Sequence, residues 1–332
     1  MWNDIDSFKS ELIYALEARV EPGYVVRTDN VIKNNNITKT GISLQRGTNA
    51  VEITPTIYVE DIYEHYRGGF VSMETITEDV YSNLVSLPEI DDLSEYMTPE
   101  FINEHVQVKV ISGNMNRSYL IDKPFIPVEG YDDLVAVAIV DLEQTPFQSK
   151  TNYSGSFVVS DALIEHLGIR KSELFEKALS NSEQNNPAKF VTMRDVLKES
   201  LISNGISEDD PMMEMMLPPE DIGPEMYVLS NKKMVFGASS IMYNGIMQEI
   251  YNKIGGDFII IPSSIHEVII IKDTDPSENS YISGMIGEIN ENIVNDSEVL
   301  SNNFYKYNGA ENTVITIKAS DLGAENSIGA EL

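Results

Sequence analysis

The sequence predicts an α+β fold built from two associated halves. The chain has 332 residues and 42% hydrophobic content, which is enough for one large domain or two ordinary domains with a core. A helix followed by an antiparallel meander near the start predicts the first half. Strand segments accompanied by two helices near the end predict the second half, a mixed sheet covered by helices over 238–253 and 276–294.

Local patterns predict the elements of the N-terminal half, residues 1–150. Ile5, Phe8, Leu12 and Leu16 recur at helical spacing and predict a helix over 4–19, with Asn3 or Asp4 as the N-cap. The elements predicted after it are strands at 24–28, 42–44 and 51–53, helices through 62–66 and 73–87, an acidic connector at 88–99, a strand at 105–111, a short helix at 114–120 and a buried strand at 134–142.

The remainder of the chain divides into a helical connector region at 151–203, an acidic Met- and Pro-rich loop or linker at 204–225, a C-terminal half at 226–320 and a flexible acidic tail at 321–332. Ser160 and Gly168 predict the two ends of a short helix. The other predicted elements are a strand at 155–159, helices from 172 and over 193–202, a strand at 226–229, two strands within 257–271, and strands at 304–307 and 313–317. Pro276 opens the last helix, whose buried stripe is expected to include Ile293.

Charge and composition exclude several classes of function. The formal net charge is −30, so the surface repels phosphates and anionic membranes, and neither direct nucleic-acid binding nor membrane binding is expected. The absence of cysteine excludes disulfides and thiol chemistry. No secretory signal or membrane-spanning run is visible, which predicts a cytoplasmic protein.

The most distinctive segment is Asp257–Ile271, in which two apolar runs flank the polar knot Ser263–Glu267. A hydrolase would use Ser263 or Ser264 as nucleophile, His266 as base and Glu267 as the orienting acid. If a strand resumes at Ile265, however, His266 and Glu267 point to opposite faces. Pro262 favours a fixed turn whose serine hydroxyls bond the backbone. A structural turn, a catalytic site and a ligand or partner contact remain alternatives for the knot.

Two further groups are candidate binding residues. Tyr58, Tyr63 and Tyr66 lie at spacings compatible with a helix, but core packing is favoured because no Lys or Arg cluster accompanies them in the sequence. Methionine side chains adapt to irregular apolar surfaces, so a methionine cluster in the acidic loop can dock in a groove or pack on its own domain. This cluster consists of Met212, Met213, Met215 and Met216.

No cofactor and no metal site is expected. The four histidines are scattered, and no phosphate-binding glycine motif occurs. Asp273, Asp275 and Glu278 follow a predicted strand, and they are interpreted as acids near a helix N-terminus rather than as ligands of a hard cation.

Four blocks carry a resemblance to a known family. They are Pro55–Glu60 with Tyr63 and Tyr66, Met226–Asn231 with Phe236, Gly237, Ala238 and Tyr243, Ile261–Ile269, and Ser297–Ser301 with Tyr305 and Tyr307. Together they resemble a bacterial domain-of-unknown-function family, number fifty-six eighty-eight, over about residues 25 to 308. The family's usual Asp in the central strand is missing from Ala136–Val140, which indicates that this Asp is structural. The resemblance implies a fold and an accessory-gene setting but no reaction.

Three functions follow as hypotheses. The leading one is a non-catalytic binding protein whose partner is a protein with a basic surface. The second is a hydrolase-like enzyme centred on Ser264, His266 and Glu267. The third is an acidic mimic of nucleic acid that acts on a defence factor, for which the acids of 71–100, 201–231 and 273–298 would align in paired rows.

Overall fold

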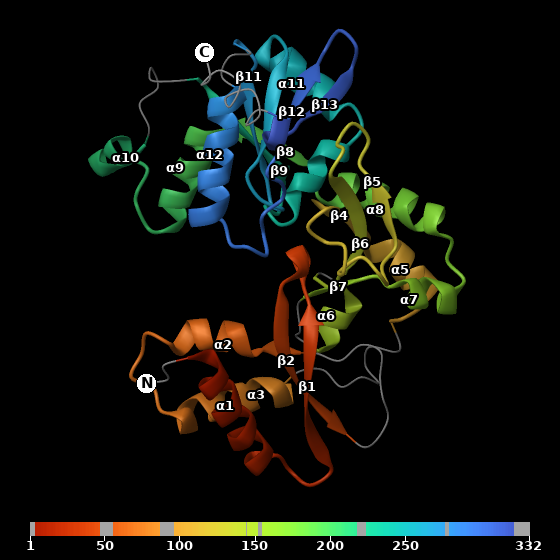
Figure 1. Ribbon diagram of the computed structural model, residues 1–332, viewed down its shortest axis with the longest axis vertical. Helices are drawn as coiled ribbons and strands as arrows, with labels where there is room; N and C mark the ends of the chain where they lie inside the picture. The colour runs from red at the N-terminus through yellow and green to blue at the C-terminus, as the bar shows by residue number, and fades with distance from the viewer. Residues whose placement is uncertain are drawn as a thin grey trace, which may run out of the picture. The chain divides into compact units, whose positions relative to one another are not determined.

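The computed structural model describes residues 4–46, 56–86, 96–143, 145–151, 155–217, 224–275 and 279–321. The chain forms two compact units, which are described separately below (Figure 1). The first comprises residues 1–102 and 142–156, and the second comprises residues 103–141 and 157–332. Helices combine with antiparallel sheets, so the predicted α+β class is confirmed.

The first unit contains a three-stranded sheet in the order β1-β2-β3. Its elements are α1 (Ile5–Arg19), β1 (Tyr24–Ile32), the 3₁₀ turn η1 (Asn34–Asn36), β2 (Thr38–Arg46), β3 (Ile57–Tyr58), α2 (Val59–Tyr66), α3 (Met73–Ser86) and α6 (Pro146–Thr151). Asp4 is the N-cap of α1, since its side chain accepts a hydrogen bond from the backbone N–H of Ser7 at 2.8 Å. The predicted strand at 51–53 lies outside the described residues.

Three helices and β2 enclose the core of the first unit. Phe8, Leu12 and Leu16 of α1 are fully buried, as the helical spacing predicts. They pack with the buried residues Ile42, Val59, Ile62, Ile76, Val80 and Leu84. The hydrophobic effect therefore holds α1, α2 and α3 together against the β1–β2 hairpin.

The described residues of the second unit form two sheets. One has the order β4-β6-β5, with β7 also paired to β6, and the other has the order β13-β12-β10-β11-β9-β8. The elements are α5 (Pro99–His105), β4 (Val106–Ser112), β5 (Phe125–Pro127), β6 (Leu134–Asp141), β7 (Ser156–Val158), α7 (Asp161–Leu167), α8 (Lys171–Asn185), β8 (Ala188–Thr192), α9 (Met193–Ser203), α10 (Pro211–Met216), β9 (Met226–Asn231), η2 (Gly237–Met242), α11 (Ile246–Ile254), β10 (Phe258–Pro262), β11 (Val268–Lys272), α12 (Asn279–Asn292), β12 (Phe304–Asn308) and β13 (Thr313–Ile317). Of these, α5 and β7 begin in the first unit.

The central strand β10 is buried on both faces, which explains its continuous apolar run. Ile259 and Ile261 share a core cluster with Ile282 and Ile286 of α12. On the other face, Phe258 stacks on Tyr307, and the ring of Tyr251 from α11 meets Tyr307 edge-on. Because successive residues of a strand point to opposite faces, α11 and α12 cover opposite faces of the six-stranded sheet.

The structure differs from expectation in the strand directions of this sheet and in one of the helices that cover it. Every strand pair determined in it is antiparallel, so the sheet is not mixed. The helix predicted over 238–253 is interrupted: η2 ends at Met242, Tyr243 is extended, and Gly245 adopts a left-handed conformation at a φ of 76° before α11 begins. The hydroxyl of Tyr243 donates to the carbonyls of Ser182 and Asn186, which holds the chain out of helical geometry there.

Three other segments also differ from expectation. Residues 114–120 form successive turns rather than a short helix. The helix α10 lies inside the segment predicted as a loop, because Asp210 caps it and Pro211 occupies its first turn. Ile293 is 77% exposed because α12 ends at Asn292, and Asn290 takes the buried position instead. Pro276 and the tail from 322 lie outside the described residues.

Candidate functional site

The polar knot Ser263–Glu267 is the loop that joins β10 to β11. Pro262 pairs with Val268, so the strand resumes at Val268. The expectation that it resumes at Ile265 is therefore wrong. The backbone N–H of Ser264 donates to the carbonyl of Glu267 at 3.1 Å. The hydroxyl of Ser264 accepts from the N–H of His266 at 3.0 Å. These two bonds close the turn.

The serine hydroxyls and the imidazole have different partners. Ser263 Oγ donates to Glu267 Oε1 at 3.5 Å, the outer limit of a hydrogen bond. Nδ1 of His266 accepts from the backbone N–H of Phe236 at 3.2 Å. A neutral imidazole has one acceptor nitrogen, so in that form its proton lies on Nε2. Nε2 faces Glu298 Oε1 at 3.6 Å. The lone pair that a general base would use is therefore occupied by a backbone donor.

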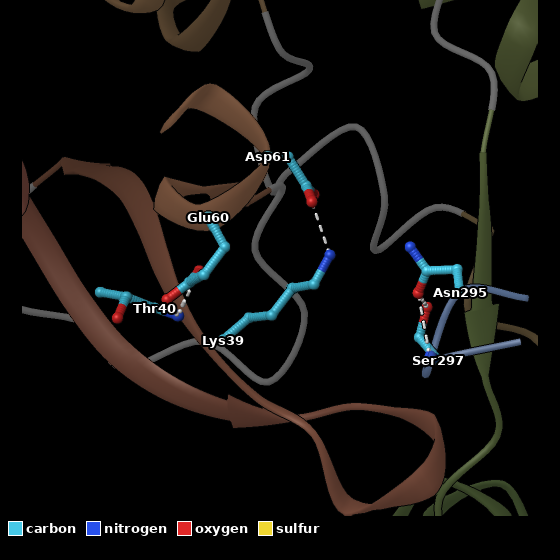
Figure 2. Close-up of polar contacts among 6 residues, drawn as sticks. All are labelled: Lys39, Thr40, Glu60, Asp61, Asn295 and Ser297. Atoms are coloured by element: carbon cyan, nitrogen blue, oxygen red, sulfur yellow. Dashed lines mark hydrogen bonds and ion pairs between the residues drawn. The ribbon is translucent and has the colours of Figure 1, made fainter. Parts of the chain in front are cut away.

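Glu298 is positioned by a turn that Asn295 caps. The Oδ1 of Asn295 accepts from the N–H of Ser297 at 2.9 Å and from its hydroxyl at 2.7 Å, as Figure 2 shows. The N–H of Glu298 donates to the carbonyl of Asn295 at 2.7 Å, and the carbonyl of Glu298 accepts from Ile265 N–H at 2.9 Å. The turn thus binds the knot through the backbone and brings a carboxylate beside the imidazole.

Residues of β9 and η2 pack directly against the knot. Ser230 Oγ donates to the carbonyl of His266 at 2.7 Å, and Ala238 N–H donates to the carbonyl of Ile265 at 3.3 Å. A Cβ on Gly237 would lie 2.1 Å from Ser230 Oγ and 2.6 Å from the carbonyl oxygen of His266. Only a glycine leaves room for this approach. Two of the blocks that carry the family resemblance therefore meet at one packed corner.

Phe236 connects this corner to the sheet of the same unit that contains β4. It has a left-handed backbone at a φ of 53°, and its ring stacks on the imidazole of His266 with centroids 5.6 Å apart. The ammonium of Lys109, on β4, lies 4.5 Å from the centroid of the Phe236 ring. Lys109 is only 8% exposed, so the cation is held in a mostly buried place beside an aromatic face.

A second polar cluster, which the sequence analysis did not identify, surrounds Asp133. The carboxylate of this buried residue accepts from Ser301 Oγ at 2.5 Å, Asn303 Nδ2 at 3.0 Å and Tyr305 Oη at 2.9 Å. Ser301 and Tyr305 belong to the fourth block of the resemblance. The sequence does show a carboxylate directly before a long apolar strand, which is a signal for such a cluster. The sequence alone does not show that this carboxylate is hydrogen-bonded to residues 168 or more positions later.

Burial acts on the pKa of two tyrosines in this cluster. Burial and the neighbouring carboxylate of Asp133 raise the pKa of Tyr305 well above its ordinary value. Burial likewise raises the pKa of Tyr131, whose ring packs edge-on against Tyr305 with centroids 4.6 Å apart. The hydroxyl of Tyr131 has no hydrogen-bond partner among the described residues. Both phenols are therefore held neutral.

The three candidate tyrosines near the start of the chain have separate surroundings in the first unit. The ammonium of Lys33 lies 4.1 Å from the centroid of the Tyr58 ring, and that of Lys39 lies 5.8 Å away, so the fold supplies cations that the local sequence lacks. Tyr63 packs on Phe8 at 5.3 Å between ring centroids. The hydroxyl of Tyr66 donates to Asp79 at 3.0 Å. All three are half-buried.

The helix α2 that carries two of these tyrosines is fastened to β2. Both carboxylate oxygens of Glu60 accept from the N–H of Thr40, at 3.0 and 2.9 Å, and Lys39 pairs with Asp61 at 2.5 Å (Figure 2). These contacts give the first block of the resemblance a structural role in the first unit.

The candidate methionines are divided between the interior and the surface. Met213 is 2% exposed, whereas Met212, Met215 and Met216 are 59%, 85% and 51% exposed. The three exposed residues stand at i, i+3 and i+4 on α10, so they lie on one helical face.

The described residues contain neither a cluster suited to a metal ion nor a helix suited to a membrane. No group of three or more His, Cys, Asp or Glu side chains in that part of the chain is placed to hold a metal ion. No helix there has the length and apolar content required to cross a membrane.

Comparison with known proteins gives one match. No curated protein and no solved structure matches the chain. The family model described as "Family of unknown function (DUF5688)" matches residues 5–309, which is most of the chain and includes all four blocks of the resemblance. The chain therefore belongs to the family of unknown function DUF5688.

Proposed function

We propose that this protein is a non-catalytic binding protein that recognises a basic amphipathic segment of a partner protein. The observation that carries the proposal is the methionine face of α10, defined as Met212, Met215 and Met216. These flexible apolar side chains are more than half exposed. Methionine adapts to varied apolar surfaces, so such a face fits the apolar side of a partner helix.

The placement of α10 supports the proposal. In Figure 1 this helix lies at the outer edge of the second unit, next to α9. It is tied to α9 by Arg194, which pairs with Glu214 at 2.5 Å, while Lys198 of α9 pairs with Glu208 at 2.5 Å. Met213 and Leu217 anchor its inner side. The methionine face is thus presented on an ordered helix rather than on a free loop.

Charge complementarity specifies the partner. Residues 204–217 contain Glu208, Asp209, Asp210 and Glu214 and no Lys or Arg. Glu208 and Glu214 are paired with cations of α9, so Asp209 and Asp210 carry the remaining acidic charge of the segment. An apolar face within an acidic segment attracts a helix with Lys or Arg around its apolar stripe and repels an acidic one. The cytoplasmic location belongs to the same proposal.

The catalytic alternative has less support from the geometry. The imidazole lone pair of His266 accepts from Phe236 N–H, and the hydroxyl of Ser264 accepts from the backbone of the knot. A nucleophile and its base require a mutual hydrogen bond. The hydrolase hypothesis and the nucleic-acid-mimic hypothesis both stay predictions.

The test uses a fluorescent synthetic peptide of leucine and lysine with helical amphipathic spacing. Its anisotropy is measured against the full chain and against the triple variant Met212→Gln, Met215→Gln, Met216→Gln. Glutamine keeps the length and helix propensity of methionine, so α10 is expected to remain folded. We expect at least about tenfold weaker binding for the triple variant, the equivalent of about 1.4 kcal/mol.

The control variant is Ile293→Gln, which removes another exposed apolar side chain of the same unit, 77% exposed. It should bind the peptide like the native chain. A peptide of the same composition in scrambled order should bind weakly, because its apolar residues no longer form a stripe. Equal binding of the ordered peptide by the native chain and the triple variant would overturn the proposal.

A further inference from the structure

A groove in the second unit lies beside the Asp133 cluster. It consists of two adjoining cavities of about 560 Å³ and 380 Å³ that share Asn114, Asp132 and Asp133 as lining residues. Small-ligand sites typically occupy roughly 300–1,000 Å³. The groove is formed by two distant segments of the chain, residues 113–135 and 303–320. It shares no residue with the methionine face.

The acids of the groove already have partners. The carboxylate of Asp133 accepts three hydrogen bonds, from Ser301, Asn303 and Tyr305. The carboxylate of Asp132 lies 3.7 Å from the ammonium of Lys318, which also lines the groove. Both carboxylates therefore interact with groups of the protein itself. A ligand entering the groove meets them already neutralised or hydrogen-bonded.

Arg117 supplies the remaining charge. It is exposed, lines the larger cavity and has no ion-pair or hydrogen-bond partner among the described residues. Asn114 stands beside it on the same turn segment, is exposed and is likewise unpartnered in the described part of the chain. A guanidinium binds carboxylate, sulfonate or phosphate groups through two parallel N–H donors, and an amide adds a third donor. An arginine without a partner among the described residues is notable in a chain with a net charge of −30.

The wall of the larger cavity is apolar. It includes Ile121, which is 80% exposed, Phe125, which is 37% exposed, and the buried Leu120. The ammonium of Lys171 lies 5.2 Å from the centroid of the Phe125 ring, which places a second cation next to this wall. The arrangement thus combines an anion-binding end with an apolar surface.

We infer that the groove binds a small amphipathic organic anion, with its charged group on Arg117 and Asn114 and its aryl or acyl body on Ile121 and Phe125. The ligand is a free small molecule rather than an anionic membrane, because the net charge of the whole chain repels a negatively charged surface. This site is independent of the partner-binding face proposed above, and each can be lost without the other.

The test probes the groove with anilinonaphthalene sulfonate, whose fluorescence rises when its rings leave water. We expect saturable binding of one dye per chain, and displacement of the dye by decanoate but not by decylammonium. The two competitors have the same apolar body and opposite charge. Displacement by both, or by decylammonium alone, would show that an anion is not selected and would overturn the inference.

Variants locate the site. Arg117→Gln should weaken dye and decanoate binding about tenfold or more, because it removes the charge-assisted hydrogen bonds between the guanidinium and the anion. Ile121→Gln should weaken dye binding without changing the preference for decanoate over decylammonium. Arg170→Gln is the matched control, since the Arg170 side chain is 81% exposed and lies in the same unit.

The outcomes separate the inference from a general loss of structure. Circular dichroism should be unchanged in all three variants, because the substituted side chains are exposed or lie at the groove edge. Equal affinities of the native chain and Arg117→Gln for decanoate would overturn the inference. The inference requires, by contrast, that Arg170→Gln binds decanoate with the same affinity as the native chain.

Discussion

The backbone N–H of Phe236 donates to Nδ1 of His266 over 3.2 Å, across a separation of 30 residues in the chain. This bond connects the segment between β9 and η2 with the loop between β10 and β11. It also decides the chemistry of the imidazole, because the acceptor nitrogen of a neutral histidine cannot receive a proton from serine while it accepts from an amide.

The first prediction concerns the close packing at the same corner. Gly237→Ala should destabilise the protein by roughly 1–3 kcal/mol or more, because the new Cβ would lie 2.1 Å from Ser230 Oγ and 2.6 Å from two backbone atoms. Urea denaturation measures the loss. The matched control is Gly284→Ala in α12, where a Cβ meets nothing within 4 Å. That change should stabilise the helix by about 0.5–1 kcal/mol. Equal effects of the two substitutions would contradict the packing described.

The second prediction concerns the catalytic alternative. A fluorophosphonate probe, which labels activated serines, should leave Ser263 and Ser264 unmodified, because neither hydroxyl is hydrogen-bonded to the imidazole of His266 among the described residues. Intact-mass measurement after incubation checks this. Fluorophosphonate labelling of a commercial serine hydrolase in the same reaction controls for active reagent. Labelling that maps to Ser264 and is lost in His266→Ala would revive the hydrolase hypothesis.

The third prediction concerns the buried carboxylate. Asp133→Asn should cost roughly 1–3 kcal/mol of unfolding free energy, because an amide nitrogen would face donors from Ser301, Asn303 or Tyr305 that now point to an oxygen. The neighbouring Asp132→Asn is the control. Its side chain is 64% exposed and its ion pair with Lys318 is surface-exposed, so the loss should be below about 1 kcal/mol. Chemical denaturation of both variants under identical conditions gives the comparison.

The fourth prediction concerns alkaline pH. The pKa values of Tyr131 and Tyr305 are raised on folding, mainly by burial. A group whose pKa is raised on folding stabilises the native state fully below its unfolded pKa, about 10 for tyrosine, and the contribution is lost as pH rises towards the folded-state value. The free energy of unfolding should therefore fall above about pH 10.

Tyr131→Phe tests this directly. It removes an ionisable hydroxyl that has no hydrogen-bond partner among the described residues, so stability at neutral pH should be equal or higher. Its decline above about pH 10 should be shallower than that of the native protein. Tyr14→Phe, at a side chain that is 75% exposed, should follow the native curve. A Tyr131→Phe curve parallel to the native one would exclude Tyr131 as a source of the pH dependence.

Most of the local structure could be predicted from local signals. The helix α1 and its Asp4 cap, and the helix α7 between Ser160 and Gly168, follow from apolar spacing and capping residues near in sequence. The strand–turn–strand of the knot follows from two apolar runs around Pro262. Predictions failed where distant residues intervene, as at Tyr243, whose hydroxyl bonds to α8 and stops a helix that periodicity alone would continue.

The sequence by itself determined the α+β class, the hairpin that contains the knot and the four blocks that place the chain in its family. The tertiary structure alone decided that His266 accepts from Phe236, that Asp133 receives donors from 168 to 172 residues away, and that Arg117 lies beside an apolar wall with no partner among the described residues. The reason is physical. Periodicity and capping act within a few residues, whereas the partner of a polar side chain depends on which distant segments packing brings within hydrogen-bond distance.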